Sequence, residues 1–333
     1  MRVTIKDIAK VANVSYSTVS RALTGQPQIP EETRKKILKV ANSMGYTPNA
    51  LAKGLVTKST YTLGLIVPDI VNPFFPEVIQ GIEECATNYG YRVYLCTSNW
   101  KIEKEKECLH KLYGSSVDGI LIFPASDDVS HITDSKINIP IVFVNHKPAC
   151  PDCSYVAVDD FKSAILAVEY LLKLGHRKIA YVGGLETNGS NIERINGFKT
   201  VMGNYGIPIR PEYIVYGEYK QSSGYQLTKE LLIDRELPTA IIAGDDLLAL
   251  GIIQAIEEFG LKVPKDISVI GFDDISYASL DKIQLTTICI PRYVMGETSV
   301  ELLIKKIQHP EDVEVRSKIL ETNLVVRKTC RGV

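Results

Sequence analysis

Long apolar runs are missing from this chain of 333 residues. No stretch reaches the roughly 18 apolar residues that a membrane-spanning helix needs. The N-terminus reaches an acid at Asp7 and has no continuous apolar region, so we expect no secretory signal and a cytoplasmic protein. The seven cysteines are too few and too scattered for a disulfide framework, and their number is odd. The composition, 45% hydrophobic and 23% charged, is that of a globular protein with two or three folding units.

Catalytic motifs are missing as well. The five histidines are dispersed, and the chain has no His-Glu-x-x-His, no phosphate-binding loop and no nucleophile elbow. Asp245-Asp246 and Asp273-Asp274 resemble paired catalytic carboxylates. Adjacent residues project to different faces, however, so we expect each pair to supply one cleft residue and one helix cap. We therefore predict no enzyme activity and no cofactor.

One cysteine pair has a chemically suggestive spacing. Cys150 and Cys153 form a Cys-x-x-Cys motif with His146 nearby. Thiolates at this spacing can hold zinc or cycle as a redox pair. A structural zinc site usually needs four ligands and only three cluster here, so we favour a proline-rich surface loop and no metal site. Metal binding and redox function remain the alternatives.

Charge is distributed unevenly along the chain. Residues 1–60 carry a net charge of +7, and the remainder carries −8. A basic N-terminal segment on an acidic body predicts a small module for a polyanion, joined to a body with another task. The alternative is a solvated helix face with surplus lysines.

The first 46 residues have the apolar periodicity of three short helices. The first begins after Thr4 and ends near Ala12, the second begins after a Ser15 cap, and the third runs from about Glu31 to Met44. Two short helices joined by a tight turn and braced by a third form a helix-turn-helix. A plain packing domain of three helices is the alternative.

The outward face of the second helix suits the major groove of DNA. Arg21 can contact a guanine edge through two hydrogen bonds, and Tyr16 and Ser17 lie near the helix N-terminus. The hydroxyls of Ser15 and Thr18 can hold phosphates. These hydroxyls and the positive charge favour DNA binding over a plain packing domain.

Four sequence blocks in this region match a known pattern in order and spacing: TIKDIA from Thr4, VSYSTVSR from Val14, ETR from Glu32 and GYTPNALA from Gly45. They resemble the headpiece of the lac repressor family of bacterial transcription regulators. The resemblance implies that Tyr16, Ser17 and Arg21 read bases. It also implies that the DNA backbone is held by three hydroxyl side chains, those of Thr4, Ser15 and Thr18.

Residues 47–58 are expected to link this module to the body. Pro48 forces the preceding residue out of the helical region, and Asn49 can cap a helix that is too short to persist alone in water. The resemblance implies a hinge helix that pairs with its dimer mate and inserts Leu55 into the minor groove at the operator centre. A flexible linker with incidental apolar residues is the alternative.

Residues 60–333 alternate strand-like and helix-like segments in two similar halves. The expected strands are Thr62–Val67, Tyr91–Thr97, Gly119–Phe123 and Ile141–Val144, then Lys178–Val182, Thr239–Ala243 and Ser268–Phe272. The expected helices are Phe75–Asn88, Glu103–Tyr113 and Val129–Ser135, then Ala164–Leu174, Glu193–Tyr205, Gly224–Ile233 and Leu247–Phe259. This alternation predicts parallel sheets covered on both faces, with ligands outside the carboxyl ends of the strands.

The body carries further recognisable blocks: GLIVPD from Gly64, VDGI from Val117, LGHR from Leu174, DDLLALG from Asp245 and IGFDD from Ile270. They resemble the periplasmic-binding-protein-like core of the same regulators. The resemblance implies a small all-α helix-turn-helix headpiece joined to a two-lobed α/β body with parallel sheets. The expected domains are a DNA-binding domain at 1–46, the hinge at 47–58, and an effector-binding and dimerisation domain at 59–333. Within it, lobe one would take about 59–159 plus 291–321, and lobe two about 160–290 plus 322–333.

Several polar or aromatic residues follow the predicted strands, where a cleft between the halves would lie. The candidates for effector binding are Phe75, Asn145, Arg194, Tyr219, Asp245 and Asp273. All but Asn145 fall at positions where relatives contact their effectors. Carboxylates and a guanidinium can grip hydroxyls while aromatic faces cover the apolar side of a sugar ring, so the set suits a carbohydrate.

Other residues near these positions have competing interpretations. Ile290 stands where many relatives place a polar residue and Arg292 lies nearby, so a phosphorylated or otherwise anionic effector is an alternative to a plain sugar. Phe74 has the character of a core residue as much as of a ligand contact, Asp274 that of a helix cap, and Asp159 that of a structural residue.

The preferred function is a homodimeric, sequence-specific transcription regulator that binds a palindromic double-stranded operator and is controlled by a small molecule. Repression relieved by the effector is the default. No heptad tail precedes the end at Val333, which favours a dimer over a coiled-coil tetramer. The alternative is a solute-binding protein of a transport system, which predicts an export signal and no basic headpiece.

Overall fold

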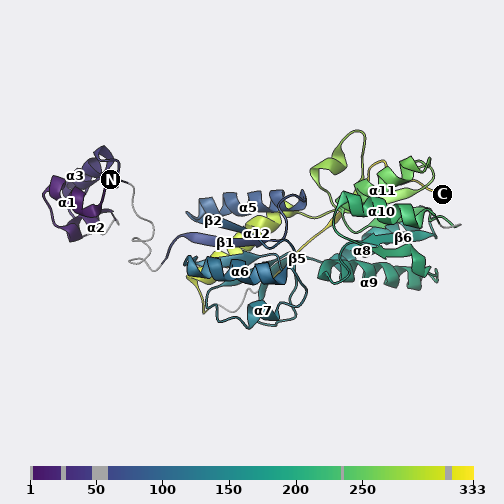
Figure 1. Ribbon diagram of the computed structural model, residues 1–333, viewed down its shortest axis with the longest axis horizontal. Helices are drawn as coiled ribbons and strands as arrows, with labels where there is room; N and C mark the ends of the chain where they lie inside the picture. The colour runs from purple at the N-terminus through teal and green to yellow at the C-terminus, as the bar shows by residue number, and fades with distance from the viewer. Residues whose placement is uncertain (1–2, 24–27, 47–58, 234–235, 312–316) are drawn as a thin grey trace. The chain divides into compact units, whose positions relative to one another are not determined.

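The computed structural model describes residues 3–23, 28–46, 59–233, 236–311 and 317–333. The chain forms two compact units, Met1–Tyr61 and Thr62–Val333 (Figure 1). We call the described part of residues 3–46 the headpiece and the second unit the body. The expected hinge at 47–58, with Leu55, lies outside the described residues.

The headpiece is built from α1 (Ile5–Ala12), α2 (Tyr16–Leu23) and α3 (Glu31–Ser43). Its core is formed by Ile8, Ala12, Val19 and Ile37, none of which exposes any surface. At the start of α2, the hydroxyl of Ser15 accepts a hydrogen bond from the backbone N–H of Thr18 at 3.1 Å. Ser15 is therefore the cap that the sequence predicts, and three-helix packing is confirmed.

Two six-stranded sheets organise the described part of the body. The first has the order β11-β5-β4-β3-β1-β2 and is parallel throughout. The second has the order β12-β10-β9-β8-β6-β7 and is parallel except for the β10–β12 pair. The first sheet consists of β1 (Thr62–Val67), β2 (Arg92–Thr97), β3 (Gly119–Ile122), β4 (Ile141–Val144), β5 (Ser154–Val158) and β11 (Ser317–Leu320). The second consists of β6 (Ile179–Gly183), β7 (Ile214–Tyr216), β8 (Ala240–Ala243), β9 (Ser268–Asp273), β10 (Thr286–Cys289) and β12 (Asn323–Val325).

Helices cover both faces of each sheet, and we call each sheet with its helices a lobe (Figure 1). Lobe one carries α5 (Phe74–Asn88) and α12 (Arg292–Gln308) on one face, and α6 (Ile102–Gly114) and α7 (Ser130–Thr133) on the other. Lobe two carries α8 (Asp160–Lys173) and α9 (Gly189–Asn204) on one face, and α10 (Gln221–Leu231) and α11 (Asp246–Glu258) on the other. Short 3-10 turns lie at Pro211–Tyr213 and Ser276–Ser279. The strands alternate their side chains between two apolar layers, as buried parallel strands do.

The chain passes between the lobes at three places. It leaves β5 for α8 around Asp159, leaves β10 for α12 around Ile290, and leaves β11 for β12 around Thr322. Each lobe is therefore assembled from segments that are distant in the sequence, and its ligand-facing edge is built from several chain segments.

Three helices of lobe two begin three or four residues before their predicted starts. Asp159 accepts a hydrogen bond from the N–H of Lys162 at 2.9 Å and begins α8. Asn188 does the same for Asn191 at 3.2 Å and begins α9. The apolar periodicity predicts only the part of each helix that packs on the sheet. The first turn of a helix and its polar cap do not follow this periodicity, so the predicted starts came too late. Asp159 thus has the structural role expected of it.

Candidate effector cleft and nucleic-acid interface

The helix α2 presents a polar surface on the headpiece. Tyr16 keeps 55% of its surface exposed, and Ser17 and Arg21 are also exposed. The hydroxyl of Ser15 lies 2.8 Å from that of Ser17 and 2.7 Å from that of Thr18. These predicted DNA contacts therefore share one short helix and its cap, an arrangement that suits a groove with phosphates on either side.

Thr4, the remaining described candidate for DNA contact, lies at the start of α1. Its N–H and its hydroxyl both donate to the Asp7 carboxylate, at 2.9 and 2.7 Å. These bonds lower the pKa of Asp7. Both donors of the exposed Thr4 are thus engaged by Asp7, so Thr4 would donate to a phosphate only after releasing this carboxylate.

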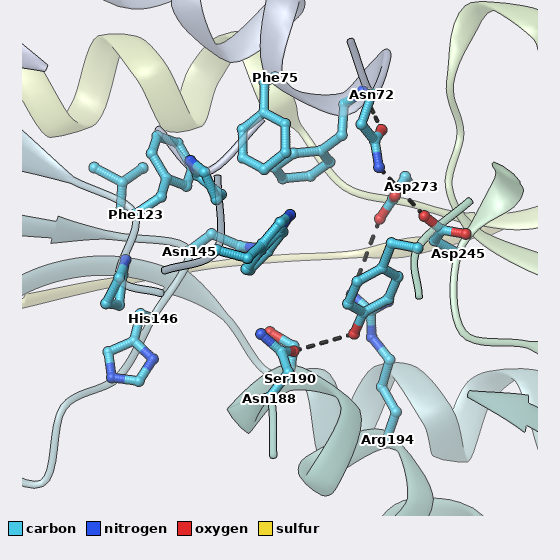
Figure 2. A pocket seen from close by; sticks show the side chains of 16 residues that line it. Asn72, Phe75, Phe123, Asn145, His146, Asn188, Ser190, Arg194, Asp245 and Asp273 are labelled. Carbon is cyan, nitrogen blue, oxygen red and sulfur yellow. Dashed lines mark hydrogen bonds and ion pairs between the residues drawn. The ribbon is translucent and has the colours of Figure 1, made fainter. Parts of the chain in front are cut away.

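A cleft of about 610 Å³ lies between the two lobes. All six residues predicted from the sequence line it, and Figure 2 shows most of them facing one another across the space. Lobe one contributes Pro68, Asn72, Phe74, Phe75, Trp100, Phe123, Pro124, Val144, Asn145 and His146, and lobe two contributes Asn188, Ser190, Arg194, Tyr219, Asp245 and Asp273.

Aromatic rings form much of the lobe-one wall. Phe75 packs edge to face on Phe123, with ring centroids 5.4 Å apart, and on Trp100 at 6.3 Å. Trp100 in turn lies 6.1 Å from the ring of Tyr219 on the other lobe. Phe74 is both a core residue and a wall residue, because it lines the cleft with only 5% of its surface exposed. The apolar face of a ring-shaped ligand would meet rigid aromatic surface here.

The facing wall on lobe two is charged. Arg194 is 3% exposed and donates to the Asp160 carboxylate at 2.7 Å and to the backbone carbonyl of Gly244 at 2.5 Å. Its third nitrogen lies 4.0 Å from the carboxylate of Asp273. A buried guanidinium therefore holds two acids at the cleft wall in a fixed geometry.

Asp245 connects the two lobes. One carboxylate oxygen accepts from the N–H of Leu248 at 2.7 Å and caps α11, and the other accepts from the amide of Asn72 at 3.4 Å (Figure 2). Burial raises the pKa of both Asp245 and Asp273, and the charge of Arg194 opposes that rise. A carboxyl with a raised pKa can donate a hydrogen bond to a ligand hydroxyl when it is protonated. The ionised carboxylate accepts a hydrogen bond from the same hydroxyl.

Two polar atoms of the lobe-one wall lack a partner among the described residues. They are the side-chain oxygen of Asn145 and Nε2 of His146, both buried. Asn145 has a φ of 53° and its N–H donates to the carbonyl of Val156 at 2.7 Å, so its side chain is turned out of the strand direction. Burial lowers the pKa of His146, and Asp127 acts against that. A buried polar atom left unpaired costs about 1–3 kcal/mol, so these atoms mark places where a ligand's polar groups would be stabilising.

Each acidic pair supplies one cleft residue, as expected, but the expectation that the other residue is a helix cap is wrong. Asp245 does both tasks, and the fully buried Asp246 instead accepts the Thr287 hydroxyl at 2.6 Å. Asp274 is no helix cap either, since its carboxylate pairs with Arg327 at 2.6 Å. Local sequence spacing cannot reveal these partners, because Thr287 lies 41 positions after Asp246 and Arg327 lies 53 positions after Asp274.

Arg292 does not line the cleft, contrary to the suggestion that it could meet an anionic effector. Its guanidinium donates to the Glu77 carboxylate, at 3.0 Å through Nε, and to the backbone carbonyls of Asp273 and Asp274. It is 5% exposed. Arg292 is thus a buried strut, a side chain that bonds to both lobes, and among the described residues Arg194 is the guanidinium that lines the cleft.

Sequence reasoning missed several cleft residues. Trp100, Phe123 and Asn188 each follow a strand of the sheets, as the predicted candidates do. The rule that ligands lie beyond the carboxyl ends of strands would have found them. Asn72 also follows a strand, β1, but its link to Asp245 spans 173 residues and gives no local signal.

In the described part of the chain no helix is long and apolar enough to cross a membrane. No group of three or more His, Cys, Asp or Glu side chains in that part could hold a metal ion. Cys150 and Cys153 are instead joined in a disulfide.

A groove-sized helix on a small three-helix unit, combined with a two-lobed body that encloses a polar cleft, defines a DNA-binding regulator controlled by a small molecule. The family model "Bacterial regulatory proteins, lacI family" matches residues 4–49, and "Periplasmic binding proteins and sugar binding domain of LacI family" matches residues 60–327. The chain belongs to the LacI family of bacterial transcription regulators.

Individual relatives cover nearly the whole chain. Catabolite control protein A of Priestia megaterium is 38% identical over 92% of both chains. The transcriptional repressor PurR of Photobacterium profundum is 32% identical over 98% of both. The crystal structure of the lac repressor dimer bound to operator and the anti-inducer ONPF superposes with a TM-score of 0.90 at 28% identity, covering 99% of this chain and all of that one. These relatives are regulators and not enzymes, and the match to the headpiece decides against a transport protein.

Proposed function

We propose that the chain is a homodimeric cytoplasmic repressor whose cleft binds a sugar or a sugar derivative, and that this binding changes its affinity for a palindromic operator. The observation that carries the sugar assignment is the facing of two unlike walls: aromatic rings on lobe one, and carboxylates with a buried guanidinium on lobe two. The match to a family of sugar-binding domains supports it. The dimer is proposed from the dimeric lac repressor structure to which the chain is similar.

A sugar uses both walls at once. The hydroxyls of its ring edge would pair with Asp245, Asp273 and Arg194, and its apolar face would lie against Phe75 and the neighbouring rings. Asn145 would receive a ligand hydroxyl at its buried, unpartnered oxygen. Because these groups come from both lobes, a bound sugar would be held only when the lobes are at the right separation.

On the DNA side, we propose that Tyr16, Ser17 and Arg21 contact base edges. We propose that Thr4, Ser15 and Thr18 contact phosphates and that Leu55 enters the minor groove between two half-sites. A difference of only about 1–3 kcal/mol in coupling between cleft and operator is enough to change operator affinity 5- to 150-fold.

A thermal-shift screen of the full chain against sugars, sugar phosphates and nucleobases tests the effector class. A ligand present at about 100 times its dissociation constant stabilises the native state by about 2.7 kcal/mol and raises Tm. We expect a sugar or sugar phosphate to raise the Tm of the wild type. The same ligand should not raise the Tm of Asp273→Asn, because Asp273 lines the cleft.

The neighbouring variant Asp274→Asn is the matched control. Its carboxylate pairs with Arg327 and does not line the cleft, so it should keep the ligand-induced shift even if its own Tm is lower. A nucleobase that shifts Tm while every sugar fails would contradict the proposed effector class.

A further inference from the structure

The loop between β4 and β5 contains the chain's Cys-x-x-Cys motif. Cys150 and Cys153 have their Cα atoms 5.4 Å apart and are joined in a disulfide. The N–H of Cys153 also donates to the carbonyl of Cys150 at 3.3 Å, which closes a tight turn. Both cysteines are half-buried, and the intervening Pro151 and Asp152 are exposed. The turn that carries the disulfide therefore lies at the surface of lobe one.

The other five cysteines lie in surroundings that suppress thiol chemistry. Burial raises the pKa of each of them, to about 11 for Cys85 and Cys108, to about 12 for Cys330, and to a lesser degree for Cys96 and Cys289. Only the thiolate is nucleophilic, so these five react slowly near neutral pH. These five thiols are therefore less reactive than an ordinary cysteine, whereas Cys150 and Cys153 are paired with each other.

This loop begins at the wall of the effector cleft. Asn145 and His146, which carry the two unpartnered polar atoms, immediately precede it and line the cleft. Figure 2 shows both residues on one side of the pocket. A rearrangement between residues 147 and 153 would therefore begin next to these two side chains.

The loop also ends at a structural junction. Cys153 directly precedes β5, whose first residue Ser154 is fixed by a hydrogen bond of 2.7 Å from Lys306 of α12. The last residue of β5 is followed by the first crossing between the lobes. The disulfide thus lies between a cleft wall and a strand that leads to the crossing.

We propose that Cys150 and Cys153 form a reversible redox modification site, oxidised by a low-molecular-weight disulfide such as glutathione disulfide, and that its state controls the shape of the effector cleft. The thiolate of one cysteine attacks a sulfur of the small disulfide, which forms a mixed disulfide and releases one small thiol. The second cysteine loses its proton, attacks the mixed disulfide and releases the second small thiol. Two protein thiols are oxidised, one small disulfide is reduced to two thiols, and the two protons end on those thiols.

The two states differ in the constraint on the loop. The disulfide closes a ring over four residues and holds the turn, whereas the reduced loop regains the freedom that this ring removes. In intracellular proteins, disulfides of this kind are usually transient and redox-sensing. The inference extends the function of a regulator to a second input, and it does not depend on which effector the cleft binds.

The experiment uses the full chain equilibrated in mixtures of reduced and oxidised glutathione. Free thiols are alkylated after an acid quench and located by mass spectrometry. The emission of Trp100, which is the single tryptophan of the chain and lines the cleft, is recorded in the same samples. Neither readout requires a known effector or operator.

As the mixture becomes oxidising, we expect Cys150 and Cys153 to become protected from alkylation, and we expect reduction to restore their alkylation. The other five cysteines should be alkylated in every mixture. The Trp100 emission should shift with this transition in the wild type and in Cys96→Ser, the control at a half-buried thiol. It should not shift in Cys150→Ser or Cys153→Ser, whose fold is checked by circular dichroism. A pair that stays alkylated in excess glutathione disulfide would overturn the proposed site. Oxidation that leaves the Trp100 emission unchanged would overturn its control of the cleft.

Discussion

Arg194→Met tests the electrostatics of the cleft directly. The guanidinium is 3% exposed, pairs with Asp160 at 2.7 Å and lies 4.0 Å from Asp273. Methionine has a similar length but no charge, so the two acids would stay buried without their partner. Removing one member of a buried ion pair costs about 3–5 kcal/mol. We expect the free energy of unfolding of the body to fall by that amount at neutral pH.

The pH dependence of this loss is a second, independent signature. Burial raises the pKa of Asp245, the acid that caps α11 at the cleft, to about 6, and the charge of Arg194 opposes that rise. A carboxyl group with a higher pKa in the folded chain binds protons more readily there. Stability therefore falls as pH rises from the unfolded value of about 4 through the folded pKa. Without Arg194 the folded pKa is higher, so the decline continues to higher pH, at about 1.4 kcal/mol per added unit. The variant should be less impaired at about pH 5 than at about pH 8.

Urea unfolding followed by circular dichroism and Trp100 emission measures both effects. The control is Arg210→Met, which removes a surface arginine that pairs with Glu212 and Glu236 on the same lobe. Such exposed pairs contribute at most about 1 kcal/mol, and their loss should depend little on pH. If Arg194→Met costs no more than Arg210→Met, or costs the same at both pH values, then the buried charge cluster does not stabilise the cleft as argued here.

Two further changes test the headpiece and the packing of lobe one. Arg21→Ala should weaken specific operator binding by about 1–3 kcal/mol in a gel shift, without lowering the Tm of the body, and an unchanged affinity would contradict its role in base reading. Gly81→Ala should destabilise lobe one in urea unfolding, because a methyl group there would collide with the backbone carbonyl of Tyr293 where α5 and α12 cross. A stability equal to the wild type would show that the two helices can move apart at no cost.

The sequence predicted best those elements whose apolar pattern is unbroken. The bounds of β1 and β4 agree residue by residue with the expected Thr62–Val67 and Ile141–Val144, because these strands are continuous apolar runs. The strands β5, β7, β10, β11 and β12 were not predicted. β7 and β12 are three residues long and only half-buried, so they have too few positions for a recognisable pattern. The helix α12 was also missed. Its neighbours β10 and β11 were not predicted, so the alternation of strand and helix that identified the other helices was not visible there.

The candidate cleft was predictable to the extent that it obeys one rule. Asn145, Asp245 and Asp273 stand at the ends of parallel strands, where such sheets place ligands, and all three line the cleft. The role of Asp274 could not be predicted, because its partner Arg327 is 53 positions further along and reaches it only through the C-terminal crossing. Contacts that depend on how the lobes are assembled are invisible to local sequence patterns.

The strut formed by Arg292 shows why the two walls of the cleft act as one unit. Its guanidinium binds Glu77 in the first turn of α5 and the backbone carbonyls of Asp273 and Asp274 on lobe two. The helix α5 begins with Phe74 and Phe75, which belong to the aromatic wall, whereas Asp273 belongs to the charged wall. A ligand that displaces either wall therefore moves the same buried guanidinium. Arg292 is also the first residue of α12, which packs along α5, so its bonds to Asp273 and Asp274 join both helices of this face to lobe two.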